Sequence, residues 1–272
     1  MRYPAVAGAF YDSSAEGLKA QVRGCFGSKL GPGELPSKGN EGKSRRIRGI
    51  VVPHAGLMYS GPVAAHAYLE LWKDGLPEVF VIIGPNHYGT SDLASLSSGD
   101  YITPLGTAHL DGSLSRRLEG GLFDFDDEAQ AGEHSIEVQL PFLQFMRSEI
   151  KFVPVCMGAQ DYETARQVGL KIASAIKDVD AVVIASSDFS HYVTPEAARE
   201  KDMVAIDRIL HNDPGGLYEA VVGRDISMCG YGPVMAMLCA VGSGQASMLA
   251  YGHSGQVERM REVVAYCSIK VE

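Results

Sequence analysis

Three histidines occupy the same kind of position in the chain, and together they could hold a metal ion. His54, His87 and His191 each follow a short apolar run and lie in a turn rich in small or polar residues. A single histidine in a loop is most often a structural or surface residue, so none of the three carries this interpretation alone. Imidazoles that meet at one place, together with a thiol or a carboxylate, are typical of a transition-metal site.

A thiol for such a site is available at Cys229, which stands just before a predicted helix over 234–241. Backbone N–H groups and the helix dipole at a helix N-terminus lower the pKa of a thiol and favour the thiolate that binds metals. The other four cysteines lie within apolar runs and have the character of small core residues. They are Cys25, Cys156, Cys239 and Cys267.

The stretch EHSIE offers another pair of polar side chains. His134 and Glu137 are three residues apart, which places them on one face of the helix that this stretch is predicted to open. A carboxylate beside an imidazole could orient a ligand or act as a general base. Alternatively, the pair could form an N-terminal cap in which Glu137 complements the helix dipole. The sequence leaves both interpretations open.

The three histidines need a parallel sheet to bring them together, and the apolar runs before them predict one. These runs are rich in β-branched residues, which is typical of strands buried on both faces. Because ligands of an open parallel sheet bind beyond the carboxyl ends of its strands, the three turns would meet at one edge. Helical periodicity between the runs completes an α/β order of elements. The predicted strands are 50–52, 79–83, 151–157, 181–187, 247–253 and 262–271, and the predicted helices include one after a Ser13/Glu16 capping box, one over 62–73 with Pro62 as its first residue, and 161–176.

Length and charge limit the classes of protein to which the chain can belong. Its 272 residues suffice for a single α/β domain over 1–272, in which the Gly-, Pro- and Ser-rich stretch 28–48 predicts a flexible surface loop. A formal net charge of -9 argues against general binding to nucleic acids or anionic membranes. The basic cluster from Lys43 to Arg48 is short, and a solvated loop explains it more simply than a phosphate contact does.

Cysteine usage and the first residues predict a cytoplasmic protein. The five cysteines are scattered and contain no C-x-x-C pair, which indicates reduced thiols rather than a disulfide framework. The apolar stretch near the start is too short for a signal peptide or a membrane span.

Five short motifs in a fixed order resemble the Memo family along nearly the whole chain. They are PHAG, GPNHYG, EHSIE, SSDFSHY and CGYGP, and the opening RYPAVAGAFY precedes them. Memo proteins share their fold with class III extradiol dioxygenases. The resemblance therefore implies a three-layer α/β sandwich, with a mostly parallel central sheet, helices on both faces and a metal site at one edge of the sheet.

Position by position, the resemblance assigns roles to particular residues. His54 and His87 match the family's histidine ligands, and Cys229 matches its cysteine ligand. His191 matches the histidine on the open side of the metal, where Asp188 of the same motif also lies, so these two would be the catalytic residues. Further positions would form the wall of the cleft or support the ligands, namely His134, Glu137, Asn86 and Tyr192.

This ligand set implies a function. Two imidazoles and a thiolate favour iron, copper or zinc over magnesium or calcium. In the related ring-cleaving enzymes a carboxylate replaces the thiolate, so Cys229 favours one-electron redox chemistry on iron or copper over ring cleavage. The leading prediction is a metal-dependent oxidoreductase with a dioxygenase-like site, in which a small-molecule or peptide ligand binds in the cleft at the sheet edge.

Two alternatives come from other classes of protein. Memo-like proteins have been linked to phosphotyrosine peptides, which suggests a phosphopeptide- or small-ligand-binding protein with an incidental metal. A zinc hydrolase would instead use a metal-bound water, with His191 or Glu137 as the base. The family also keeps company in prokaryotes with a radical-SAM protein and a small companion protein, which implies partners in a modification pathway.

Overall fold

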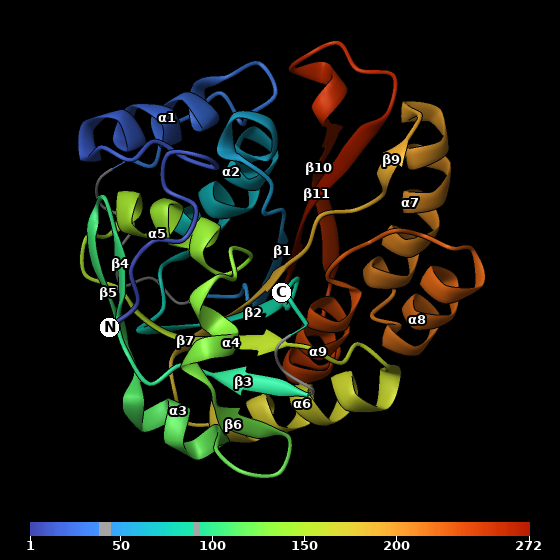
Figure 1. Ribbon diagram of the computed structural model, residues 1–272. Helices are drawn as coiled ribbons and strands as arrows, with labels where there is room; N and C mark the ends of the chain where they lie inside the picture. Colours follow the sequence, from blue (N-terminus) through green and yellow to red (C-terminus); the bar gives the residue numbers. More distant parts are fainter. Residues whose placement is uncertain (38–44, 90–92) are drawn as a thin grey trace.

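The computed structural model describes residues 1–37, 45–89 and 93–272, and a β-sheet with helices on both faces forms its centre (Figure 1). Within the described residues eleven strands join this sheet, and the main path through it has the order β10-β11-β1-β8-β2-β7-β3-β6. The prediction of an α/β sandwich with a mostly parallel central sheet is confirmed. The strands are β1 (Gly49–Val52), β2 (Val79–Pro85), β3 (Ala94–Leu96), β4 (Tyr101–Thr103), β5 (Gly106–Leu110), β6 (Phe123–Phe125), β7 (Lys151–Met157), β8 (Ala181–Ser186), β9 (His191–Val193), β10 (Ala246–His253) and β11 (Val263–Val271).

The helices connect these strands in the alternating order that the sequence predicts. They are α1 (Ala15–Gly27), α2 (Leu57–Asp74), α3 (Gly112–Leu118), α4 (Asp127–Ala131), α5 (Leu140–Met146), α6 (Tyr162–Ala175), α7 (Pro195–Leu210), α8 (Pro214–Gly223) and α9 (Tyr231–Val241), with short 3-10 turns at Glu137–Gln139 and Ser254–Gln256. Within the described ranges, none of these helices combines the length and the apolar character that crossing a bilayer requires.

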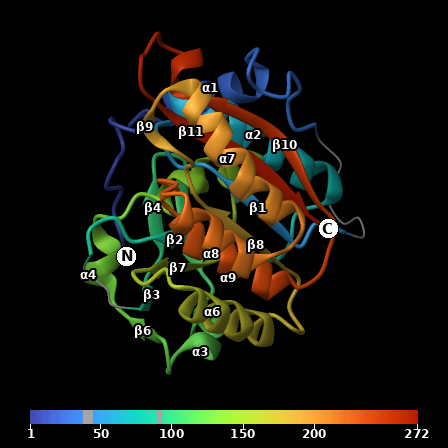
Figure 2. The same cartoon turned by 90° about the vertical axis from the view of Figure 1, so that its right-hand side faces the viewer.

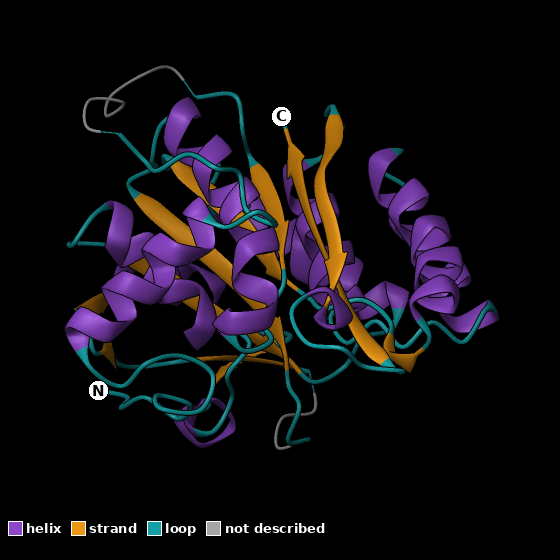
Figure 3. Ribbon diagram, turned by 90° about the horizontal axis from the view of Figure 1, so that it is seen from above, coloured by secondary structure: helices purple, strands orange, loops and turns teal. Residues whose placement is uncertain are grey.

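Alternating side chains of the central strands build two separate cores. In β1, Ile50 and Val52 belong to one cluster of buried residues, whereas Val51 belongs to the other. This follows from the strand geometry, because successive side chains point to opposite faces of a sheet. α1, α2 and α5 cover the first face, and α6 to α9 cover the second (Figures 1 and 2). Viewed from above, the strands lie between these two groups of helices (Figure 3).

The strands in the middle of the sheet are parallel, and their carboxyl ends are aligned. β1 pairs with β8, β8 with β2, and β2 with β7, all in parallel. Val51 pairs with Ala185, which on its other side pairs with Ile83. The turns that carry His54 and His87 therefore begin at the same edge of the sheet. The margins differ, because β11 runs antiparallel to β1 and β3 runs antiparallel to β7.

The starts of α1 and α2 differ from the prediction. The cap of α1 is Ser14, whose side chain accepts a hydrogen bond from a backbone N–H of the first turn at 3.1 Å, and not Ser13. α2 already begins at Leu57, and Pro62 lies inside it. The Leu57 N–H donates to the carbonyl oxygen of Phe10 at 2.8 Å, so the chain before α1 supplies an acceptor that the helix alone lacks.

The predicted loop 28–48 is described only in part, because 38–44 lie outside the described residues. The described residues on either side of this gap contact α2. Trp72 Nε1 donates to the carbonyl oxygen of Ser37 at 2.7 Å, and the backbone N–H of Arg46 donates to Asp74 at 2.7 Å. These two contacts fasten both sides of the loop to the same helix.

Candidate metal centre

The turns after β1 and β2 and the loop before α9 bring three candidate metal ligands together. One ligand atom from each of His54, His87 and Cys229 lies within 4.8 Å of the other two. Ligand atoms around one tetrahedral metal ion are about 3.5 Å apart, so small movements of the side chains would close the site. His54 is buried, whereas the side chain of His87 is 29% exposed. The site is therefore accessible from the His87 side.

Cys229 reaches this edge because α9 packs against β8, β2 and β1. The backbone N–H of Gly230, the residue before α9, donates to Ser187 Oγ at 3.0 Å. A Cβ atom at Gly230 would collide with the carbonyl oxygen of Ser186. The loop that carries the thiol can thus approach the end of β8 only because Gly230 has no side chain.

The hydrogen bonds of Ser186 determine which ring nitrogen of His54 carries the proton. Ser186 Oγ donates its single hydrogen to the carbonyl oxygen of Ser135 at 2.6 Å. It must therefore accept from His54 Nδ1, which is 2.9 Å away. Nδ1 is then protonated, and Nε2 is the free ligand atom. Burial, followed by repulsion from three neighbouring histidines, lowers the pKa of His54 well below its usual value, so the ring is neutral.

Glu133, which was absent from the predicted site, does the same for His87. Its carboxylate accepts from His87 Nδ1 at 2.9 Å, from the His87 N–H at 2.7 Å and from the Ser135 N–H at 2.7 Å. Burial alone would raise the pKa of Glu133, but these hydrogen bonds and the charge of His87 lower it to about 2. A carboxylate only accepts, so Nδ1 of His87 is protonated, and in the neutral ring, the form that binds a metal, Nε2 is free. The signal that could have identified Glu133 is its place directly before His134 in EHSIE.

The environment of Cys229 differs from the prediction. Its Sγ lies 3.2 Å from His54 Nε2 and 3.2 Å from the backbone nitrogen of Asp188. Burial, followed by the charge of Asp188, raises the pKa of the thiol well above its usual value. The expectation that the helix N-terminus lowers the pKa of Cys229 is therefore wrong for the metal-free protein. Desolvation of the buried sulfur outweighs the effect of the helix dipole. The thiol faces a neutral imidazole nitrogen, an arrangement in which a cation can replace the thiol proton.

The turn after β8 carries Asp188 and His191, which play different parts. Asp188 Oδ1 accepts from the N–H groups of His54 at 2.8 Å and Ala55 at 3.3 Å, so it holds the PHAG turn in place. Burial raises the pKa of Asp188, although these two N–H groups act in the opposite direction. His191 is partly exposed and close enough for its charge to influence the pKa of His54. Its Nδ1 lies 2.8 Å from the carbonyl oxygen of Ser227.

His134 lies against the ligands, but it does not share a helix face with Glu137. Its ring stacks on His87 with 4.5 Å between ring centroids, and its centroid is 5.5 Å from that of His54. The predicted shared face is wrong because the chain becomes helical only at Glu137. His134 Nδ1 is buried without a hydrogen-bond partner, 3.6 Å from Glu133, and burial lowers the pKa of His134 to about 4. Such an unsatisfied nitrogen beside two imidazoles and a thiol fits a site that takes up a metal and its ligand.

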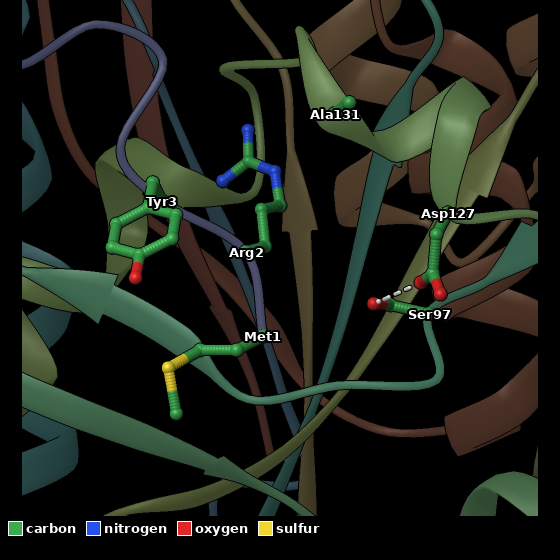
Figure 4. Close-up of a pocket in the computed structure, with 6 residues that line it drawn as sticks. All are labelled: Met1, Arg2, Tyr3, Ser97, Asp127 and Ala131. Carbon is green, nitrogen blue, oxygen red and sulfur yellow. Dashed lines mark hydrogen bonds between the residues drawn. The ribbon is translucent and has the colours of Figure 1, made fainter.

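Glu137 has a structural environment outside the ligand group. Its buried carboxylate accepts from Arg2 Nη1 at 2.8 Å, from the Ala5 N–H at 2.8 Å and from Tyr11 Oη at 2.5 Å. These bonds fasten the first residues of the chain to the start of the helical segment. Arg2 also lines a pocket of about 330 Å³ that contains none of the three candidate ligands (Figure 4). Its other lining residues are Met1, Tyr3, Ser97, Asp127 and Ala131.

The two remaining predicted cleft residues differ from each other. Asn86 Oδ1 accepts from the N–H groups of Tyr88 at 2.9 Å and Gly89 at 3.1 Å, so it shapes the turn that carries His87. Tyr192 is 75% exposed and has a φ of 56°, an uncommon backbone conformation for a bulky residue. Exposure and backbone strain beside His191 are consistent with a functional position.

The basic cluster lies away from the candidate site. Arg48 directly precedes β1, whereas His54 follows its other end. Arg48 donates to the carbonyl oxygen of Val241 at 2.6 Å, and Arg45 pairs with Asp180 at 2.5 Å. Lys43 lies outside the described residues. The described arginines of the cluster therefore make intramolecular contacts at the opposite edge of the sheet.

Fold and site together define an α/β protein with a His/His/Cys donor set at the carboxyl ends of its parallel strands. The family model for Memo-like proteins matches residues 2–270. MEMO1 family proteins of Methanothermobacter thermautotrophicus and Methanopyrus kandleri are each 45% identical to the chain, over 99% of both sequences in the first case and 98% in the second. The chain belongs to the Memo family.

A solved structure supports the fold. An uncharacterized protein from Escherichia coli K12 is similar with a TM-score of 0.60, over 84% of this chain and 100% of that chain. The two sequences are 14% identical, so this likeness concerns the fold alone.

Proposed function

We propose that this protein is a metal-dependent oxidoreductase with a dioxygenase-like site, in which His54, His87 and Cys229 hold iron or copper. The observation that carries the proposal is the convergence of the three donors. Hydrogen bonds to Nδ1 leave Nε2 of both imidazoles free to bind. A soft sulfur beside two imidazoles favours iron, copper or zinc over magnesium and calcium.

The chain's own groups have distinct tasks in this proposal. When bound, the metal supplies one-electron redox chemistry. Cys229 loses its proton when it becomes a ligand, and Glu133 and Ser186 orient the two imidazoles. Asp188 holds the PHAG turn through two backbone N–H groups. His191 receives or returns a proton at Nε2 for a small-molecule or peptide substrate bound at the exposed side.

Anaerobic metal binding tests this proposal. Protein purified without chelators is titrated with Fe(II) or Cu(I), and we expect about one equivalent to bind. Cys229→Ser and His54→Ala should weaken binding at least tenfold. Cys239→Ser is the matched control, because Cys239 is a half-buried thiol of α9 outside the ligand group. Absence of stoichiometric binding, or equal binding by wild type and Cys229→Ser, would refute the assignment.

A zinc hydrolase is the second candidate, and the same donor geometry favours it, because catalytic zinc sites combine three protein ligands with one open position. Its base would be His191 rather than Glu137, since four protein donors already occupy the buried Glu137 carboxylate. Oxygen-insensitive activity with zinc would favour this candidate. A cytoplasmic location, phosphopeptide binding, a single domain and radical-SAM partners stay predictions.

A further inference from the structure

The loop that carries Cys229 also holds His191 in place, through Ser227. Ser227 and His191 are 36 positions apart, yet three hydrogen-bond contacts join them. The His191 N–H donates to Ser227 Oγ at 2.8 Å, and this hydroxyl donates to the His191 carbonyl oxygen at 3.3 Å. The third contact joins His191 Nδ1 to the Ser227 carbonyl oxygen at 2.8 Å.

The third contact determines the proton position on the imidazole ring. A backbone carbonyl oxygen can only accept, so Nδ1 of His191 must carry a proton. In the neutral ring the lone pair is then on Nε2, because the hydrogen bond of one ring nitrogen decides the state of the other. The two hydroxyl contacts hold the backbone of His191 so that the carbonyl oxygen of Ser227 stays within reach of Nδ1.

The turn that carries His191 is firmly held from its other side as well. The buried carboxylate of Asp202 accepts from the Ser190 N–H at 3.1 Å, from Ser190 Oγ at 2.6 Å and from Tyr251 Oη at 2.8 Å. With Ser190 fixed in this way, the position of the His191 ring depends on its contacts with Ser227. Ser227 lies two residues before Cys229, so one short segment positions both the thiol and the imidazole.

We infer that Ser227 is a positioning residue that keeps His191 in the Nδ1–H tautomer and thereby makes Nε2 the proton acceptor. This role rests on the proposed function, because the acceptor at Nε2 would serve the reaction at the metal. The tautomer itself can be measured without metal or substrate, so its test is independent of that function. In the other tautomer Nε2 would carry a hydrogen and could accept nothing.

The test is the ¹⁵N spectrum of histidine-labelled, metal-free full-length protein, at a pH where the spectrum shows neutral rings. The His191 signals are those that disappear in His191→Gln. We expect Nδ1 of His191 to have the shift of a protonated nitrogen and Nε2 that of an unprotonated one. Ser227→Ala keeps the carbonyl oxygen that faces Nδ1 but removes the two hydroxyl contacts that hold it there. A weaker contact with Nδ1 should lower the ratio of the two tautomers by about three- to tenfold, a change of the size of one typical hydrogen bond. Ser227→Thr, which keeps a hydroxyl, should restore it.

Ser243→Ala is the control, since it removes the hydroxyl of an exposed serine after α9 and should leave the His191 signals unchanged. An Nε2–H tautomer in the wild type would overturn the inference, and this measurement does not depend on the Ser227 variants. An unchanged tautomer in folded Ser227→Ala would overturn it as well. Metal titration of the same samples keeps the two claims apart, because absence of metal binding by the wild type refutes the proposed function and leaves the tautomer result standing.

Discussion

Replacing Glu133 with glutamine is the sharpest perturbation that the candidate metal centre offers. The two oxygens of Glu133 accept three N–H groups, those of His87 Nδ1, the His87 backbone and the Ser135 backbone. Glutamine has nearly the same shape, but one of its two terminal groups is an NH₂ donor. Whichever way the amide is turned, its NH₂ faces at least one N–H donor. At least one charge-assisted hydrogen bond is therefore lost.

The magnitude follows from this count. A hydrogen bond to a charged group contributes about 1.5–3 kcal/mol, so Glu133→Gln should lower the free energy of unfolding by about that amount. Changes of groups that orient a metal-binding histidine typically weaken metal affinity by about 10- to 100-fold. We therefore expect the dissociation constant for Fe(II) or Cu(I) to rise by about 10- to 100-fold while one equivalent still binds, because His54, His87 and Cys229 remain.

The stability effect of Glu133 should depend on pH in a defined direction. The folded protein holds the pKa of Glu133 at about 2, below its usual value of 4.5. A lowered pKa means that the carboxylate stabilises the fold above pH 4.5 and that this contribution is lost as the pH falls towards 2. In urea unfolding of the metal-free proteins, the difference between wild type and Glu133→Gln should thus be large at pH 7 and shrink below pH 4.5.

Glu128→Gln is the matched control, because it removes the same charge from an exposed position of α4. It should change neither metal affinity nor the free energy of unfolding by a measurable amount. Competition with a chelator of known affinity, carried out without oxygen, measures the dissociation constants. If Glu133→Gln bound metal as tightly as wild type, the claim that Glu133 orients His87 as a ligand would be wrong.

Two further substitutions test the framework around the site. Gly230→Ala should lower the melting temperature and weaken metal binding, because the added Cβ collides with the carbonyl oxygen at the end of β8. Gly223→Ala is the control and should do neither, because a Cβ atom added at Gly223 meets no other atom within 4 Å. Arg2→Ala should lower the free energy of unfolding by about 3–5 kcal/mol in urea titrations, because it leaves the buried Glu137 carboxylate without its cation. It should leave the metal stoichiometry at the wild-type value, and loss of metal binding would place Glu137 in the site after all.

The sequence predicted the sheet and the place of its three strand-end histidines for a simple physical reason. Buried parallel strands are continuous apolar runs, and the residue types that follow them must lie at the carboxyl edge. His54 and His87 could therefore be placed near each other without tertiary information. Cys229 needed the resemblance to the Memo family as well, because it reaches the edge only through the packing of α9 and the absence of a side chain at Gly230.

Spacing along the chain did not predict the contacts of Glu137 and Glu133, because their partners are distant in the sequence. Glu137 was interpreted as a partner of His134 from an assumed helical spacing, yet the segment is not helical at His134, and Glu137 pairs with Arg2, which is 135 positions away. Glu133 was overlooked because its partner, His87, is 46 positions away. Such partners depend on how two turns meet at the sheet edge, and local periodicity carries no information about that.

The hydrogen bonds around the site imply that metal binding should also stabilise the fold. Each of three imidazoles has its Nδ1 proton directed to an acceptor of the scaffold, which leaves Nε2 as a bare acceptor: Ser186 for His54, Glu133 for His87 and the Ser227 carbonyl for His191. His54 Nε2 faces Cys229 Sγ at 3.2 Å, and the buried Nδ1 of His134 beside them has no hydrogen-bond partner. A cation bound by His54, His87 and Cys229 gives the lone pairs of all three a common partner in the folded state alone, so its binding should stabilise the fold.

The expected consequence is a melting temperature that rises with metal concentration. A ligand that binds only the folded state at 100 times its dissociation constant contributes about 2.7 kcal/mol of stability. Wild type and Cys239→Ser should gain this stability from Fe(II) or Cu(I) in anaerobic thermal unfolding, whereas Cys229→Ser should gain much less. Equal gains in all three proteins would mean that the metal binds somewhere else, and the convergence of His54, His87 and Cys229 would then have another cause.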